Sequence, residues 1–261
     1  MDDLSATKFS MKRQAGSLLP TSGKKDEEIT ILLCLLKVCA KTKDLNKGRS
    51  LHEDILKKGL LSKNPYLASA LINMYAKCGL LLKAQQVLEE LPIRNLACWN
   101  ALIGGYVQQG RGYEALNCFE CMQSEGLSPN VVTSTCILKA CACVGDIDKG
   151  ERTHKEVVSM GWLHKDIMLG NALVDMYAKC GMLIKAHEVL KELPIRNTVT
   201  WSALIAGYTE QGQGHTALNC FEWMQSEGLL ADVVTFTSLL KACSITGTIA
   251  KGKQIHDEIV T

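Results

Sequence analysis

The stretch from Asn100 to Leu127, NALIGGYVQQGRGYEALNCFECMQSEGL, returns with few changes from Ser202 to Leu229 as SALIAGYTEQGQGHTALNCFEWMQSEGL, 102 residues further along the chain. The same spacing separates MYAKCG at Met74 from MYAKCG at Met176. Sequence that recurs at a fixed spacing is typical of arrays in which each repeat buries its apolar face against its neighbours. The chain is therefore interpreted as a tandem array rather than as one globular domain around an active site.

The turn glycines and the phase of the apolar residues divide the array into long, short and standard repeats of 36, 31 and 35 residues, which together make up the 102-residue spacing. A leader that lacks periodicity and is rich in polar residues, residues 1–28, precedes them and is predicted to be disordered. The predicted repeats are 29–64 (long), 65–95 (short), 96–130 (standard), 131–166 (long), 167–197 (short), 198–232 (standard) and a partial long repeat, 233–261.

Each repeat contains two apolar-periodic segments around a short turn, which predicts two helices. In repeat 96–130 we expect a first helix from about Trp99 to Gln109, a turn at Gly110-Arg111-Gly112, and a second helix from about Tyr113 to Glu125. A single helix pair cannot bury its apolar face, so the pairs must stack. The predicted fold is all-α, a right-handed α-solenoid of about seven antiparallel helix pairs, the last one truncated, with the first helices on the concave side.

Smaller features of the sequence give further expectations about packing. Thr133, Thr200 and Thr235 are predicted to be N-caps of first helices. Close approach between helices is predicted at small residues of one phase, namely Ala84, Ala115, Ala186 and Ala217, with Gly48, Gly150 and Gly252 in the long repeats.

Composition excludes several classes of protein. The formal net charge is only +2, so charge alone does not predict nonspecific binding to nucleic acid. No apolar stretch reaches the ~20 residues that a membrane-spanning helix requires, so no membrane association is expected. Most of the twelve cysteines occupy equivalent places in different repeats, as small packing residues do, and the Cys118–Cys121 pair becomes Cys220–Trp223 in its copy. No metal site and no cofactor are predicted.

These repeats resemble the pentatricopeptide repeat family in its plant PLS subclass. The marks are the triplet of repeat lengths, MYAKCG in the short repeats, LLKACS and ILKACA in the long repeats, and WNALIGGY with EALNCFECMQ in the standard repeat. The resemblance covers about residues 29–261 and implies binding of single-stranded RNA along the concave face, one base per repeat. It implies further that the fifth and last residues of a repeat read the base and that the second residue sandwiches it.

The resemblance assigns a base to each pair, running 5′ to 3′ as the chain runs from its N- to its C-terminus. The implied base-reading residues are Ser69 and Asn95 (adenine), Asn100 and Asn130 (a pyrimidine, cytosine slightly preferred), Thr135 and Asp166 (guanine), Asn171 and Asn197 (a pyrimidine), Ser202 and Asp232 (guanine), and Thr237, whose repeat lacks a last position. The implied base-sandwiching residues are Ala97, Val132, Met168, Val199 and Val234. Repeat 29–64 departs from the pattern, because Leu33 holds the fifth position and Lys43 replaces the turn glycine seen at Gly145.

Two observations leave alternatives open. Lysines of one phase, such as Lys139 and Lys241, suit phosphate contacts or an ordinary solvated face. Trp99 and Trp201 could stack on bases, but their place inside apolar runs favours core packing.

No catalytic motif is complete. His256-Asp257-Glu258 matches half of the zinc-deaminase pattern, whose Cys-x-x-Cys half is absent. The sequence therefore predicts no enzyme. The resemblance to the PLS subclass implies an organellar RNA-binding protein of the mitochondrion or chloroplast, which acts in C-to-U editing with a deaminase-bearing protein supplied in trans. The alternatives are a tetratricopeptide-like protein-interaction scaffold and a non-functional fragment of a longer editing factor.

Overall fold

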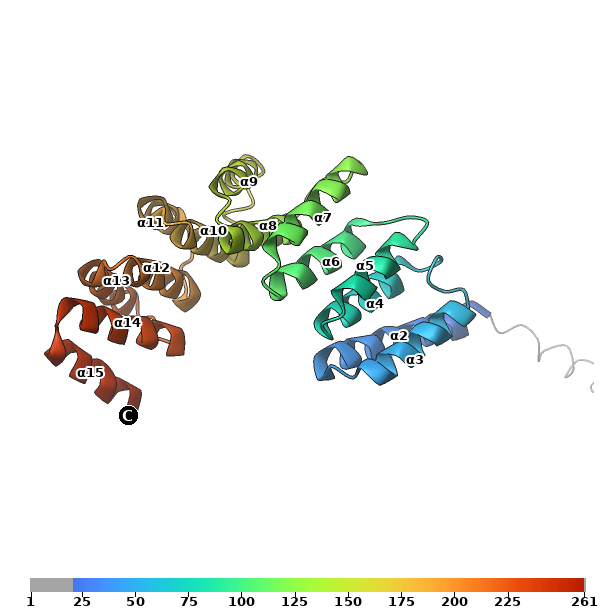
Figure 1. Cartoon of the computed structure of the whole chain (residues 1–261), viewed down its shortest axis with the longest axis horizontal. Coiled ribbons are helices and arrows are strands. Elements are labelled where there is room, and N and C mark those ends of the chain that lie inside the picture. The colour runs from blue at the N-terminus through green and yellow to red at the C-terminus, as the bar shows by residue number, and fades with distance from the viewer. Residues whose placement is uncertain (1–20, 261) are drawn as a thin grey trace, which may run out of the picture. The chain divides into compact units, whose positions relative to one another are not determined.

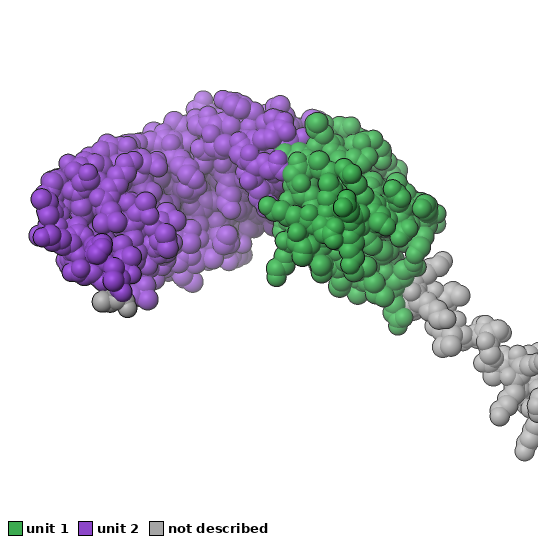
Figure 2. All heavy atoms as spheres, turned by 60° about the horizontal axis from the view of Figure 1, so that its bottom comes forward, with its two compact units in different colours: residues 1–92 green, residues 93–261 purple. Residues whose placement is uncertain are grey.

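The computed structural model describes the backbone of residues 21–260 and the side chains of residues 26–260. Within that range the secondary structure consists of α-helices, which form seven consecutive pairs (Figure 1). The chain divides into two compact units, residues up to Pro92 and residues from Ile93 onward, each described below by itself (Figure 2).

Unit 1 contains two helix pairs. The first helices α2 and α4 pack against each other, and each also packs against its own second helix. The helices are α2 (Thr21–Thr42), α3 (Leu45–Lys57), α4 (Pro65–Lys77) and α5 (Leu81–Glu89). Helix α2 begins before Ile29, so residues 21–28, which the sequence pattern assigns to a disordered leader, are helical here. The rest of the predicted leader lies outside the described residues.

Unit 2 contains five helix pairs, and its first helices pack in series, α6 on α8, α8 on α10, α10 on α12 and α12 on α14. The first helices are α6 (Leu96–Gln108), α8 (Val131–Val144), α10 (Ile167–Lys179), α12 (Thr198–Glu210) and α14 (Val233–Thr246). The second helices are α7 (Gly112–Ser124), α9 (Ile147–Ser159), α11 (Leu183–Glu192), α13 (Gly214–Ser226) and α15 (Ile249–Val260). The predicted α-solenoid of stacked helix pairs is confirmed.

The core consists of the apolar stripes on which the prediction of paired helices rests. In α6 the side chains of Leu102 and Ile103 are fully buried, and in α7 those of Ala115 and Met122 are as well. Ala84, Ala186 and Ala217 are likewise fully buried, which confirms close approach at this phase. In two long repeats a glycine provides that space, because a Cβ at Gly48 would lie 2.5 Å from Sδ of Met74 and a Cβ at Gly150 would lie 2.7 Å from Sδ of Met176. The prediction is wrong for Gly252, where a Cβ would make only ordinary contact, 3.6 Å from Cβ of Cys243.

The turn of repeat 96–130 is confirmed with one correction. Gly110 has φ of +70°, which favours glycine, and ends the first helix. Gly112 instead begins α7, and its missing Cβ is a packing requirement. A Cβ there would lie 2.6 Å from Cγ1 of Val144 and 2.9 Å from the carbonyl oxygen of Ala140.

Candidate nucleic-acid interface

In each of the five repeats with a predicted base-reading pair, the last residue is the N-cap of the next first helix. Its side-chain Oδ1 accepts the backbone N–H three residues further on, which would otherwise lack a partner in the helix. The bonds are Cys98 N–H to Asn95 (2.9 Å), Thr133 to Asn130 (3.0 Å), Leu169 to Asp166 (3.0 Å), Thr200 to Asn197 (3.0 Å) and Thr235 to Asp232 (2.8 Å).

The prediction that Thr133, Thr200 and Thr235 are N-caps is therefore wrong. Each lies three residues inside the helix and is fully buried. Thr133 and Thr200 complete capping boxes, because their hydroxyls also accept the N–H of the cap residue. An Asn or Asp caps a helix better than Thr does, and here it stands at the position where the chain turns into the helix.

Capping uses one side-chain oxygen of the last residue and leaves its other polar group for a further hydrogen bond. Because an amide NH2 cannot accept a hydrogen bond, the helix N–H must take the oxygen of Asn130, which leaves its NH2 as a donor. In Asp232 the remaining group is a carboxylate oxygen, which is an acceptor. Partial burial raises the pKa of Asp232, but hydrogen bonds to its carboxylate, chiefly those from the backbone N–H and the hydroxyl of Thr235, outweigh this, so the carboxyl has a pKa below its usual 3.8. The two caps thus present opposite hydrogen-bonding polarity.

In the two standard repeats the fifth residue meets the last residue. Asn100 Nδ2 donates to Oδ1 of Asn130 at 3.3 Å. Ser202 Oγ lies 3.3 Å from Oδ1 of Asp232 and 2.7 Å from the carbonyl oxygen of Thr198. The structure therefore brings together pairs that are 30 residues apart in the chain.

The other fifth residues have different surroundings. Thr135 and Thr237 donate to backbone carbonyls of their own helices, at 2.8 and 2.7 Å. Asn171 is only 7% exposed, and its Oδ1 is buried without a hydrogen-bond partner. Ser69 donates to the carbonyl of Tyr66 at 3.0 Å and belongs to unit 1, whereas Asn95 belongs to unit 2.

The second residues of the repeats are exposed apolar side chains. In each first helix the second and fifth residues are three apart, which places them on one face. Val132, Met168, Val199 and Val234 are 54 to 57% exposed, and Ala97 is exposed too.

Sequence reasoning missed Tyr66, which holds the second position of repeat 65–95 and is 69% exposed. The phase of the repeats identifies it. An exposed aromatic ring at this phase suits stacking better than the aliphatic residues do.

The two tryptophans are structural, as their apolar setting predicts. Trp99 is 5% exposed, and its Nε1 donates to Glu125 at 2.8 Å, while Arg94 pairs with the same carboxylate at 2.6 Å. Trp201 and Glu227 repeat the first bond at 2.9 Å. The two tryptophan bonds tie the first helix to the end of the second helix, and Arg94 ties the loop before α6 to the end of α7. Lys139 and Lys241 are exposed, which suits either of their interpretations.

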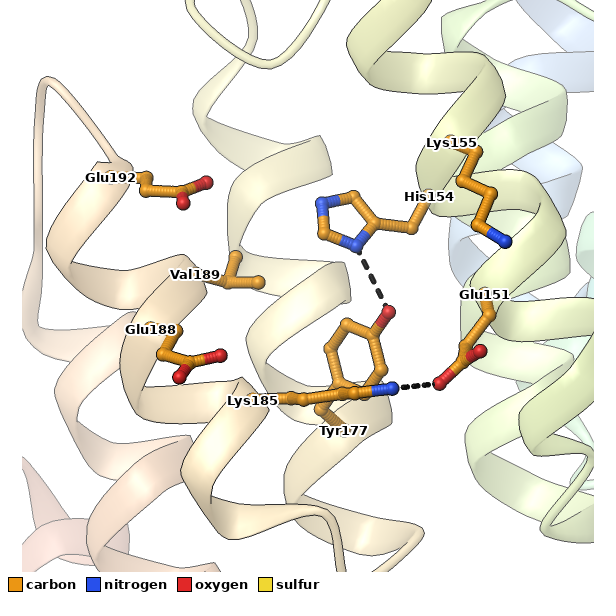
Figure 3. A pocket seen from close by; sticks show the side chains of 8 residues that line it. All are labelled: Glu151, His154, Lys155, Tyr177, Lys185, Glu188, Val189 and Glu192. Atoms are coloured by element: carbon orange, nitrogen blue, oxygen red, sulfur yellow. Dashed lines mark hydrogen bonds and ion pairs between the residues drawn. The ribbon is translucent and has the colours of Figure 1, made fainter.

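The histidines of the second helices take part in packing. His52 Nδ1 and His154 Nδ1 each lie 2.9 Å from a tyrosine hydroxyl, that of Tyr75 and Tyr177 respectively. Burial lowers the pKa of both imidazoles below 6.5. His154 projects into a cleft of about 240 Å³ between α9 and α11, beside an ion pair of Glu151 with Lys185 (Figure 3).

The cleft does not provide a set of metal ligands. Among the described residues no group of three or more His, Cys, Asp or Glu side chains could hold a metal ion, and the described cysteines form no disulfide. His256, Asp257 and Glu258 are exposed on α15. None of the described helices is long and apolar enough to cross a membrane.

Comparison with known proteins agrees with this geometry. The PPR repeat family matches residues 94–143 and 196–244, and the PPR repeat matches residues 67–96, 132–162 and 171–197. The chain belongs to the pentatricopeptide repeat family. The PLS subclass stays a prediction, since these matches identify the family alone.

Several Arabidopsis thaliana proteins named as pentatricopeptide repeat-containing are similar to the chain. One putative member is 35% identical over 226 residues, which are 86% of this chain and 45% of the relative. Another, whose name includes the word mitochondrial, is 38% identical over 221 residues, 84% of this chain and 32% of the relative. The chain thus spans less than half the length of these relatives.

The fold is similar to that of the pentatricopeptide repeat protein PPR10, solved in complex with an 18-nt psaJ RNA element. The TM-score is 0.64 at 17% identity, over 96% of this chain and 41% of that one. Identity this low supports a likeness of fold alone.

Proposed function

We propose that this pentatricopeptide repeat protein binds single-stranded RNA and selects its sequence. The observation that carries the proposal is the meeting of Asn100 with Asn130 and of Ser202 with Asp232 at the starts of first helices. Beside each pair stands an exposed apolar side chain three residues before the fifth position, Ala97 or Val199. A polar pair next to an apolar surface suits a base that is hydrogen-bonded on its edge and stacked on its face.

The group that the last residue offers, a hydrogen-bond donor in Asn or an acceptor in Asp, supports a division of the four bases into two pairs. Guanine and uracil carry a ring N–H on the Watson–Crick edge, which a carboxylate accepts. Adenine and cytosine carry a ring nitrogen acceptor there, to which an amide NH2 donates. Asp166 and Asp232 therefore suit guanine or uracil, and Asn95, Asn130 and Asn197 suit adenine or cytosine.

The fifth residue completes the assignment by resemblance to the family. Hydroxyl residues go with purines and asparagine with pyrimidines, so that the preferred RNA is 5′-A-C-G-C-G-3′ for repeats 65–95 to 198–232. The resemblance left a pyrimidine open at Asn100 and Asn171. The donor groups of Asn130 and Asn197 favour cytosine at both places.

Binding to short labelled RNAs tests the proposal. Fluorescence anisotropy at about 0.15 M salt would compare an RNA containing ACGCG between uridine flanks with a scrambled RNA of equal composition, since salt controls the nonspecific term. We expect the ACGCG RNA to bind at least about tenfold more tightly, because one good direct contact contributes about 1–3 kcal/mol of discrimination. Equal affinity for both RNAs would refute selection of sequence, and absence of binding to either would favour a protein-interaction scaffold.

We also propose that the protein is a specificity factor for C-to-U editing in an organelle, with a deaminase-bearing protein acting in trans. Support for editing comes from the likeness of its repeats to the PLS subclass. Support for an organelle comes from relatives whose names include the word mitochondrial. Sequencing of mitochondrial and chloroplast transcripts after loss of the protein tests both: an editing site that returns to C supports the proposal, and unchanged editing in both organelles refutes it.

A further inference from the structure

Thr133 lies at the centre of the polar group formed by Asn100 and Asn130, although it belongs to the next repeat. Its side chain is fully buried at the third position of α8. Its Oγ1 lies 2.8 Å from Oδ1 of Asn100 and 3.0 Å from Oδ1 of Asn130, and it accepts the N–H of Asn130 at 3.2 Å.

The number of donors at each oxygen decides which of the two amide oxygens accepts the hydrogen bond from the Thr133 hydroxyl. A hydroxyl has one proton to donate. Oδ1 of Asn130 already accepts the backbone N–H of Thr133 and the Nδ2 of Asn100. Oδ1 of Asn100 has the shorter contact with the hydroxyl, so the hydroxyl of Thr133 donates its hydrogen bond to Oδ1 of Asn100. The amide oxygen of Asn100 is then held inward, and its NH2 keeps one hydrogen for a base.

Thr235 repeats the arrangement one super-repeat later. It is fully buried at the third position of α14, and its Oγ1 donates to Oδ1 of Asp232 at 2.7 Å. Because that proton is used, the same Oγ1 accepts the hydroxyl proton of Ser202. Thr235 thus joins the fifth and last residues of repeat 198–232, as Thr133 joins those of repeat 96–130.

Thr200 shows that capping alone does not require this bridge. It stands at the same position of α12 and completes a capping box with Asn197, donating to Oδ1 of that residue at 2.8 Å. No hydrogen bond links it to Asn171, whose Oδ1 is buried without a partner. The third helical position is Cys98 in α6 and Leu169 in α10, which have no hydroxyl.

We propose that Thr133 and Thr235 are positioning residues that set the base selectivity of the repeat preceding their own, an inference that rests on the proposed RNA-binding function. Thr133 fixes which amide group of Asn100 faces the base, and Thr235 holds Ser202 and Asp232 in one arrangement. In these two standard repeats the base-reading group is therefore completed by a residue of the following repeat.

The Thr133→Val variant of the full chain tests the proposal. Valine has nearly the same shape but no hydroxyl, so Asn100 becomes free to turn its amide. Affinity is measured for ACGCG RNA and for RNAs carrying each other base at the second position. We expect the preference for cytosine there to fall by about 3- to 10-fold, the loss of one hydrogen bond, while preferences at the other positions stay unchanged.

Two further variants separate positioning from stability. Thr133→Ser keeps the hydroxyl and should keep the preference. Thr200→Val removes an equivalent capping-box hydroxyl, so it should lower the melting temperature as Thr133→Val does. It should leave the base preference at the position read by repeat 167–197 unchanged. As a direct readout, the side-chain NH2 signals of Asn100 in a 15N–1H NMR spectrum should change in Thr133→Val and not in Thr200→Val.

The outcomes are distinguishable. If the wild-type chain selects its RNA sequence and the Thr133→Val variant selects it equally well, the proposed role of Thr133 is refuted and the proposed function stands. The role of Thr133 is also overturned if Thr133→Val and Thr200→Val weaken selection equally at every position. A wild-type chain without any base preference overturns the proposed function and the positioning role together.

Discussion

Asn130→Asp reverses the polarity of one cap without removing the cap, and it is the sharpest test of how the bases would be read. Oδ1 of Asn130 accepts the N–H of Thr133 at 3.0 Å and Nδ2 of Asn100 at 3.3 Å, and the hydroxyl oxygen of Thr133 lies 3.0 Å from it. An aspartate oxygen accepts the same donors. Asp232 does so in the copied repeat, where the two bonds from Thr235 are 2.8 and 2.7 Å.

The stability of the variant should therefore change little. Asn and Asp are similarly good N-caps, and the added negative charge at a helix N-terminus is favourable by about 0.3–1 kcal/mol. The group left to face the base changes from an amide NH2 to a carboxylate oxygen. That oxygen repels the ring nitrogen of cytosine and accepts the ring N–H of uracil.

The expected effect on RNA binding is a reversal of preference at one position. Cytosine should lose about 1–3 kcal/mol and uracil should gain a similar amount, the range for a good direct contact to a base edge. Anisotropy titrations with ACGCG and AUGCG RNAs measure the change, and thermal melting checks that the variant is folded. The reciprocal change, Asp232→Asn, should shift the last position from guanine toward adenine. A folded Asn130→Asp variant that still prefers cytosine would show that the polarity of the cap does not select the base.

Three further predictions concern stability. Lys43 has φ of +56°, so Lys43→Gly should raise the free energy of unfolding by about 1 kcal/mol in urea titrations. The control Lys41→Gly, inside α2, should lower that free energy by a similar amount. A Lys43→Gly variant no more stable than the wild type would contradict the prediction. Gly112→Ala should cost about 1–3 kcal/mol because its Cβ would overlap Val144, while Gly104→Ala, with Cys136 Sγ 3.7 Å away, should be neutral or stabilising. Burial lowers the pKa of His52 and His154, so the folded state binds fewer protons than the unfolded state. The free energy of unfolding should therefore fall as the pH drops below 6.5 toward the folded-state pKa values. A double His52→Gln, His154→Gln variant should show a flatter pH dependence of stability, and an unchanged slope would exclude these histidines as its source.

Much of the helix pairing is predictable because it follows from local pattern. The apolar phase and the turn glycines indicate a helix pair such as α6 and α7 to within a few residues, and the apolar setting of Trp99 identifies it as core. The capping residues were wrongly predicted for a local reason. Asn130 and Thr133 both favour helix starts, and only the backbone geometry shows which of them stands at the turn into the helix.

The period, the helical fold and the identity of the polar residues at each phase all follow from the sequence alone. Which of those residues touch is a property of the tertiary structure. Asn100 reaches Asn130 and Thr133, whereas Asn171, of the same type and phase, leaves its amide oxygen buried without a partner. The two asparagines differ because contacts between residues about 30 apart depend on how one helix pair packs on the next.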